Sequence, residues 1–260
     1  MSADRLHHPR SPSSLPYLAQ CPKFKNRQST NAAATRGTLQ HSAVETGADH
    51  AVLTDAHALA ALDCKAYCMN LAAQYPGCKI LQEVYLPIDN ASVEVTAPAR
   101  LAEVVNTDPD TGLESVGFRW QDDFTATFQG STGGYADFCL VSADETVGVV
   151  IDFKFGDWPV DDAEDNEQGM AYLLGLLKQF PKLQKVSVRF LMPHLDFISE
   201  HTFVRDQFKD LLFRVQHTIQ TAEEAQKRPE DFSLARPQRR LLTRRTIRRG
   251  TFRKDGSQRH

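Results

Sequence analysis

Three charged side chains near the middle of the chain have the types and spacing of a metal-dependent hydrolase. Asp137 follows a double glycine, and Asp152 and Lys154 come directly after the apolar residues 149–151. Residues two apart in a strand point to the same face, so Asp152 and Lys154 would share one face of a sheet. Burying an isolated charge is costly, so these side chains need charged partners or a metal ion.

The chemistry available to such a group is phosphodiester hydrolysis. Carboxylate oxygens suit hard divalent ions such as Mg²⁺ and Mn²⁺. Asp137 and Asp152 on adjacent strands could hold one or two such ions against a scissile phosphate. The ions would lower the pKa of an attacking water and neutralise charge on the leaving oxygen. Lys154 would orient that water, help to deprotonate it, or stabilise charge in the transition state, and the sequence leaves these roles open.

Two further pairs lie on predicted helices on either side of this group. His41 and Glu45 are four residues apart on a short helix that Thr38 is predicted to cap, so they share a face. Gln168 and Tyr172 have the same spacing on a later helix. A solvated pair on a surface helix is the alternative interpretation of the first pair, and a half-buried helix face that of the second.

With these pairs in place, Asp137 followed by Asp152-Phe153-Lys154 resembles the PD-(D/E)XK signature of the restriction-endonuclease-like nuclease superfamily. The flanking pairs make the chain similar to the RecB-type exonuclease branch and related phage nucleases, over about residues 11–180. The resemblance implies these roles: His41, Asp137 and Asp152 as metal ligands, Glu45 as support of the metal site and a catalytic residue with Asp137, Asp152 and Lys154, and Gln168 and Tyr172 as substrate contacts.

The cysteines depart from one part of that branch. Its iron–sulfur members have one cysteine before the histidine and three near the C-terminus, whereas here Cys21 lies upstream and none follows Cys139. We therefore expect Mg²⁺ or Mn²⁺ and no iron–sulfur cluster. The cluster Cys64, Cys68 and Cys78, with His57 nearby, lacks the usual paired zinc-ligand spacing, so core or free thiols are expected there. The odd number of cysteines argues against a disulfide framework.

The elements predicted around these residues make an α/β (α+β) fold, a central mixed β-sheet flanked by helices, as in restriction-endonuclease-like proteins. A helix is expected from Asp55 to about Tyr75, and its helical-period residues are predicted to face the core: Leu59, Leu62, Ala66, Met69 and Ala73. Later helices are expected at 164–178 and 205–227. The β-type runs, rich in β-branched and aromatic residues, are 79–86, 92–97, 124–129, 135–141, 147–155 and 185–193. Residues 107–112 form a predicted turn.

Charge and composition divide the chain into three segments. Ten of the 30 basic residues lie within 236–260, beside a single acid, so an acidic body carries a basic tail. The predicted segments are 1–35 as an N-terminal segment, 36–232 as the nuclease domain and 233–260 as a disordered tail. No apolar run is long enough to span a membrane, and the N-terminus has no secretory signal, so a cytoplasmic protein is expected.

The leading hypothesis is therefore a metal-dependent DNA nuclease, in the first instance an exonuclease, in phage or prophage DNA processing or recombination. DNA is the expected partner, with a recombination protein as a possible second and no membrane. The alternative from another class is a DNA-binding accessory protein that keeps the nuclease fold with little or no catalysis. A third is a hydrolase of RNA or small molecules that uses the same metal-binding face.

Overall fold

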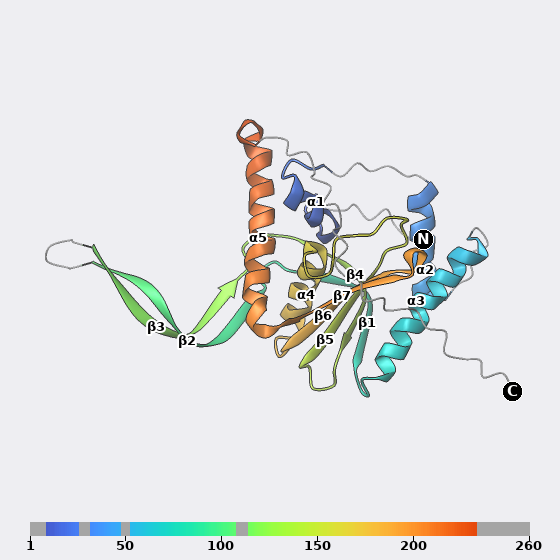
Figure 1. Cartoon of the computed structure of the whole chain (residues 1–260), viewed down its shortest axis with the longest axis horizontal. Helices are drawn as coiled ribbons and strands as arrows, with labels where there is room; N and C mark the ends of the chain where they lie inside the picture. Colours follow the sequence, from blue (N-terminus) through green and yellow to red (C-terminus); the bar gives the residue numbers. More distant parts are fainter. Residues whose placement is uncertain (1–8, 26–31, 48–52, 108–113, 233–260) are drawn as a thin grey trace.

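The computed structural model describes residues 9–25, 32–47, 53–107 and 114–232 (Figure 1). Its helices are α1 (Leu15–Gln20), α2 (Ala32–Thr46), α3 (Asp55–Ala73), α4 (Glu167–Gln179) and α5 (Arg205–Lys227). Its strands are β1 (Lys79–Pro87), β2 (Ser92–Thr107), β3 (Glu114–Thr127), β4 (Gly133–Val141), β5 (Val147–Phe153), β6 (Lys185–Met192) and β7 (Phe197–Val204). Short 3₁₀ turns are η1 (Pro12–Ser14), η2 (Pro193–Leu195) and η3 (Pro229–Asp231).

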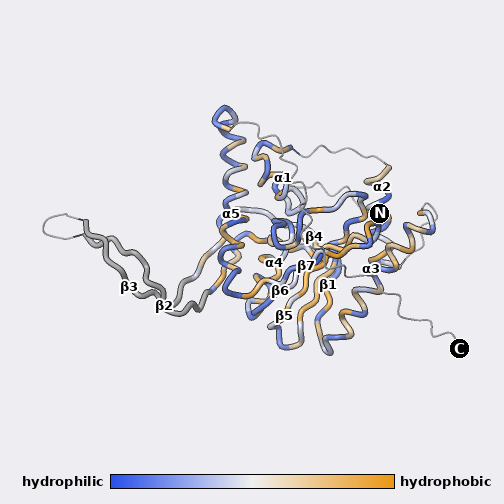
Figure 2. Tube along the Cα trace, in the orientation of Figure 1, coloured by the Kyte–Doolittle hydropathy of each residue, from blue (hydrophilic) through white to orange (hydrophobic). Residues whose placement is uncertain are grey.

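Five strands form a mixed sheet in the order β1-β4-β5-β6-β7. Only β5 and β6 run parallel, and α4 makes the crossover between them, whereas the other neighbouring pairs are antiparallel. The strands of this sheet are among the most apolar parts of the body (Figure 2). The predicted fold class, a mixed sheet flanked by helices, is confirmed.

Helices cover both faces of the sheet. On one face, α1, α4 and α5 pack with the strands in a core that includes Leu15, Leu173 and Phe208. On the other face, α2 and α3 pack in a second core that includes Val44, Phe138 and Leu140. Because Leu15 and Leu18 are almost completely buried, the N-terminal segment contributes to the same core as the predicted nuclease domain.

The face of α3 that contacts the sheet differs from the prediction. Leu59, Leu62 and Met69 are 53%, 56% and 50% exposed, so the predicted core-facing stripe lies on the outside. The buried face carries small residues instead: Ala60, Ala61, Cys64, Cys68 and Ala72, together with Leu71. Small side chains let a helix lie close to a sheet, and here they decide which face is buried. Cys64 and Cys68 are buried free thiols, as expected.

Helix α2 is longer than predicted at its N-terminal end. It runs from Ala32 to Thr46, so Thr38 lies in its middle and is not a cap. The Thr38 hydroxyl instead donates a hydrogen bond to the Ala34 carbonyl one turn earlier. Threonine hydroxyls inside helices often find a hydrogen-bond acceptor in this way. His41 and Glu45 share this helix, as predicted.

Helix α4 lies unusually close to the sheet because it has glycine at the contact points. A Cβ at Gly169 would come within 2.4 Å of Val188, and one at Gly175 within 2.7 Å of Leu86. Any larger side chain would push the helix away from the strands. This close approach fixes the height of Gln168 and Tyr172 above the sheet.

The remaining elements agree in part with the predictions from sequence. Predicted strands appear at each expected place, and α5 has the predicted bounds. Strand β7 was not predicted, and β2 and β3 are longer than expected and pair as a ribbon that projects from the body (Figure 1). The predicted turn at 107–112 and the basic tail lie almost entirely outside the described residues. Among the described helices, none has the length and apolar character needed to cross a membrane.

Candidate functional site

The pairing of β1 with β4 is interrupted at one position. Gln82 pairs with Phe138 and Val84 with Ala136, while Glu83 and Asp137 face each other between them without a ladder pair. On β4, Ala136 and Cys139 both pack in the core beside α4, although they are three residues apart. Side chains of a regular strand alternate with a period of two, so the alternation is inverted here.

The inversion is also visible in the backbone of β1. Glu83 has a φ of 46°, in the left-handed region that residues other than glycine rarely adopt. On the same strand, Leu81 and Val84 both pack toward the core beside α4. Strain of this kind persists only where the surrounding structure enforces it, and it is frequent at functional sites. The interruption therefore turns two carboxylates, Glu83 and Asp137, out of the regular sheet pattern.

A histidine from α2 completes this group. One ligand atom each from His41, Glu83 and Asp137 lies within 4.8 Å of the others, and all three residues are half-buried. The Nδ1 atom of His41 is 3.1 Å from Oδ1 of Asp137. The His41 ring packs edge-on against Phe155, with 5.1 Å between ring centroids, which orients it toward the strands.

The charge around His41 determines its protonation. Burial is the largest single influence and opposes a charge on the imidazole, but the carboxylates of Asp137, Asp152 and Glu83 together outweigh it, so the pKa of His41 is raised. An imidazole binds a metal ion only through a neutral nitrogen. A cation in this group would therefore take the place of a proton on His41, in the same negative environment.

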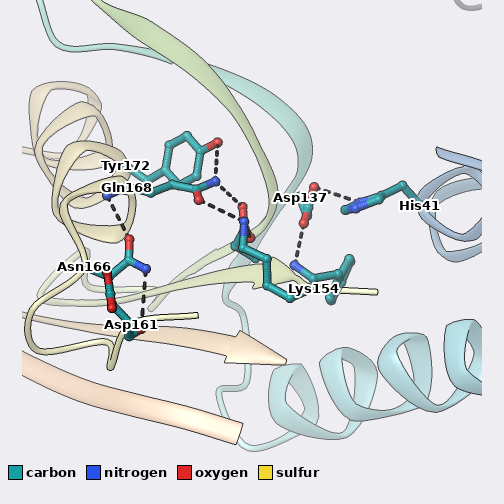
Figure 3. A network of polar contacts seen from close by, with 9 residues as sticks. His41, Asp137, Lys154, Asp161, Asn166, Gln168 and Tyr172 are labelled. Atoms are coloured by element: carbon teal, nitrogen blue, oxygen red, sulfur yellow. Dashed lines mark hydrogen bonds and ion pairs between the residues drawn. The ribbon is translucent and has the colours of Figure 1, made fainter. Parts of the chain in front are cut away.

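A second polar group lies between β5 and α4 (Figure 3). Lys154 Nζ is 2.8 Å from Asp152 Oδ2 and donates a hydrogen bond of 2.8 Å to Oε1 of Gln168. The Gln168 amide donates to Asp152 Oδ1 at 2.9 Å and to the Tyr172 hydroxyl at 3.3 Å. Gln168 thus holds the aspartate and the lysine in one arrangement.

This group is buried, and burial controls its proton affinities. Burial raises the pKa of Asp152, the Lys154 ammonium opposes the rise, and the Asp137 carboxylate adds to it. Burial also raises the pKa of Tyr172 well above its ordinary value, with Asp152 as a further cause. The Tyr172 hydroxyl therefore keeps its proton at physiological pH.

One oxygen of Asp152 retains acceptor capacity. Oδ2 is buried in an ion pair with Lys154 Nζ, 2.8 Å away, and no other described group donates a hydrogen bond to it. A carboxylate oxygen has two lone pairs, and the Lys154 ammonium occupies only one side of this oxygen. The remaining lone pair could accept a bond from an incoming ligand.

Asp137 connects the two groups. Its Oδ2 accepts a hydrogen bond of 2.6 Å from the backbone N–H of Phe153, on the strand that carries Asp152. Because Phe138 pairs with Ile151, extending the register by one residue places Asp137 opposite Asp152. Figure 3 shows Asp137 between His41 and Lys154.

The predicted residues are thus divided between two adjoining groups. The structure brings His41 and Asp137 together with the unpredicted Glu83, and Asp152 and Lys154 together with Gln168 and Tyr172. Among the described residues, Asp152 is not within the compact ligand group, because its carboxylate is held by Lys154 and Gln168. Glu45 is also outside that group, but it lines the same small pocket as His41, Glu83 and Asp137. Other residues lining that pocket include Lys65, Gln82 and Phe153.

The donors fit a hard divalent cation. One imidazole nitrogen and two carboxylates, with Asp152 Oδ2 on the adjoining strand beside Lys154, form an oxygen-rich set. Such a set suits Mg²⁺ or Mn²⁺ better than a soft metal, because no thiolate is part of it. The nearby thiols of Cys64 and Cys139 are held protonated, because burial strongly raises the pKa of each.

Sequence reasoning missed Glu83 and the residue that positions Gln168. Asn166 is the N-cap of α4, where its side chain accepts a hydrogen bond of 3.0 Å from the Gln168 backbone N–H. The signal for Asn166 was a helix-capping residue just before an apolar helix. The signal for Glu83 was the spacing of three between Leu81 and Val84 in a strand that otherwise alternates.

Comparison with known proteins gives a family. No curated protein matches the sequence. The family described as a protein of unknown function (DUF2800) matches residues 13–241. That match includes every element from α1 to α5 and both polar groups, so the chain belongs to the DUF2800 family.

Proposed function

We propose that this chain is a divalent-metal-dependent nuclease that hydrolyses phosphodiester bonds of DNA. The observation that carries the proposal is the junction at Asp137. One of its carboxylate oxygens lies in the group with His41 and Glu83, and the other is hydrogen-bonded to the strand that presents Asp152 and Lys154. Carboxylates on two adjacent strands could hold the cation that assists phosphate hydrolysis, and a lysine beside them could stabilise negative charge.

The chain's own residues would divide the work as follows. His41, Glu83 and Asp137 would hold the cation, with Asp152 Oδ2 as an additional ligand. When bound, Mg²⁺ or Mn²⁺ supplies a water of lowered pKa and neutralises charge on the leaving oxygen. Lys154 would donate a hydrogen bond to the attacking water or to a phosphate oxygen. Gln168 would keep Lys154 and Asp152 in position through its two hydrogen bonds.

A positively charged side chain also lines the pocket beside the proposed ligands. Lys65 of α3 lines it together with His41 and Asp137. A lysine at this place would attract the phosphate backbone without reading the bases. The position of Lys65 therefore supports a polyanionic substrate over a small neutral one.

The resemblance to RecB-type nucleases supports DNA as the substrate and a phage-type processing or recombination role. It also supports an intracellular place of action, because that is where such DNA is processed. Action from a DNA end, as an exonuclease, is the mode that this resemblance favours.

The test uses purified protein with end-labelled linear DNA and with closed circular DNA. We expect cleavage of linear DNA with Mg²⁺ or Mn²⁺, none with EDTA, and little cleavage of closed circles. The matched control is Asp210→Asn, which removes an exposed carboxylate on α5. Metal-dependent cleavage that the Asp137→Asn variant loses and the control keeps would support the proposal. DNA binding without cleavage under every metal condition would overturn it and favour the accessory-protein alternative.

A further inference from the structure

Two exposed tyrosines form a pair next to the proposed metal ligands. Tyr85 of β1 and Tyr135 of β4 are register partners, with ring centroids 5.2 Å apart and planes 58° from parallel. They are 49% and 43% exposed, which is high for aromatic residues inside a sheet. The pair therefore presents aromatic surface to solvent near one end of two paired strands.

A glycine gives one of these rings its position. A Cβ at Gly133 would come within 2.6 Å of the Tyr85 hydroxyl oxygen and 2.8 Å of its ring carbon Cζ. The Tyr85 side chain therefore lies directly over the backbone of β4 at Gly133. This packing places the ring across the two strands.

The inverted alternation decides which face carries the pair. Leu86 and Ala136 point into the core beside α4, and a Cβ at Gly134 would meet Tyr172 of that helix. Tyr85 and Tyr135 alternate with these residues, so they lie on the opposite face, the one that α2 and His41 also occupy. Without the inversion at Glu83 and Asp137, the tyrosines would face α4.

The distance from the pair to the ligands is short. Tyr85 is two residues from Glu83, and Tyr135 is two residues from Asp137, on paired strands. Two residues of strand span about 6.6 Å. If a phosphate bound at Glu83 and Asp137, the base of the adjoining nucleotide could therefore reach Tyr85 on β1 and Tyr135 on β4.

We propose that Tyr85 and Tyr135 form a stacking site for an unpaired base next to the scissile phosphate, and that the substrate is single-stranded DNA or an unpaired end. This inference rests on the proposed function. Aromatic side chains bind single strands by stacking on bases of any sequence. In a duplex the base faces are covered by neighbouring pairs, so a duplex offers the pair no such surface.

A purely structural role for the pair makes a different prediction. Cross-strand aromatic pairs also stabilise a sheet by packing. Leucine retains apolar cross-strand packing but has no π-face, and phenylalanine retains both. The substitutions Tyr85→Leu, Tyr135→Leu and Tyr85→Phe therefore separate stacking from packing.

The experiment measures binding of a short single-stranded oligonucleotide that contains 2-aminopurine, in EDTA so that no cleavage occurs. Stacking on an aromatic ring quenches this base's fluorescence, and fluorescence anisotropy gives the affinity. We expect wild type and Tyr85→Phe to quench the probe, and each leucine variant to bind about five- to a hundredfold more weakly. Phe213→Leu, an exposed aromatic substitution on α5, is the matched control and should bind like wild type.

The outcomes separate this inference from the proposed function. Leucine variants that bind and quench like wild type would overturn the stacking site, even if all variants cleave DNA. Equal weakening by Tyr85→Phe and Tyr85→Leu would also overturn it. Ring-dependent binding of single strands in a protein that cleaves nothing would support the stacking site and overturn the nuclease.

Discussion

The two polar groups that meet at Asp137 are built in opposite ways. Between β5 and α4, Asp152, Lys154 and Gln168 are joined by direct contacts in a buried setting. Between β1 and β4, Glu83 and Asp137 lie where the regular pairing stops, half-buried and lining a small pocket. The first group is preorganised by its own hydrogen bonds, whereas the second concentrates negative charge that a cation would neutralise.

The comparison shows how one sheet can provide both precise positioning of side chains and a site for an ion. Precise positioning requires satisfied hydrogen bonds and close packing, which α4 supplies through its glycines. Ion binding requires several ligand atoms gathered in one place, and the interrupted pairing brings Glu83 and Asp137 together beside His41. Placing the demands on adjacent strand pairs allows each to be met without weakening the other.

The largest expected effect comes from the residue that belongs to both groups. Asp137→Asn keeps an oxygen for the Phe153 N–H but removes the charge beside His41 and Glu83. We expect Mn²⁺ affinity and the DNA cleavage rate to fall by more than about a hundredfold, since changing even a supporting partner of a ligand costs ten- to a hundredfold. Titration with Mn²⁺ and end-labelled DNA measure the two effects. Unchanged values for both would remove Asp137 from the site.

Glu83 tests the open group alone. Glu83→Gln should weaken Mn²⁺ binding by about ten- to a hundredfold while leaving the fold unchanged. Glu83→Gly should lose metal binding in the same way but raise the free energy of unfolding by about 1 kcal/mol, because glycine adopts a positive φ without strain. Chemical denaturation compares the variants. A glycine variant less stable than wild type would contradict the strain at this position.

Lys154 tests the preorganised group. Lys154→Met leaves Asp152 buried without its cation, and we expect a loss of about 1–3 kcal/mol in the free energy of unfolding. Asp152 has a raised pKa in the folded protein, so the folded state binds its proton more tightly than the unfolded state does. The penalty should therefore shrink as the pH falls through that raised pKa and grow as the pH rises. Thermal unfolding over a pH series measures this, and a pH-independent penalty would argue against an uncompensated carboxylate.

The smallest effect is expected at the far end of the same network. Tyr172→Phe removes only the hydroxyl that accepts a hydrogen bond from Gln168 at 3.3 Å. We expect a stability change of about 0.5–1.5 kcal/mol and unaltered Mn²⁺ affinity. Denaturation and Mn²⁺ titration together give the answer. A loss of metal binding here would show that the two groups are coupled more tightly than their contacts indicate.

Much of the fold could be predicted from the sequence, because the clearest patterns of apolar residues have one physical cause, the burial of those residues in the core. The apolar strands at 147–153 and 185–192 and the amphipathic helix α5 lie where periodicity predicts them. Strand β7 was missed because its hairpin turns through η2 and a left-handed Asp196, without the glycine or asparagine that marks most turns.

The errors have physical reasons as well. On α3 the large residues Leu59 and Leu62 suggested the buried face, yet close packing against the sheet selected the small ones. In the site, Asp152 and Lys154 were predictable because they lie two residues apart at the end of one strand. Glu83 was not, because its importance arises from a strand partner 54 residues away, a relation that only the register reveals.

The root of the ribbon formed by β2 and β3 has a consequence for how the family can diversify. Backbone hydrogen bonds from Ile88 to Thr132 and from Phe128 to Ala91 close that root, and Ile88 and Phe128 are buried. A closed and buried root separates the projecting part from the strands that carry Glu83 and Asp137. Insertions and deletions toward the tip can then accumulate without moving the carboxylates. We expect relatives to differ most in ribbon length, so the ribbon is the part of the molecule most open to evolutionary change.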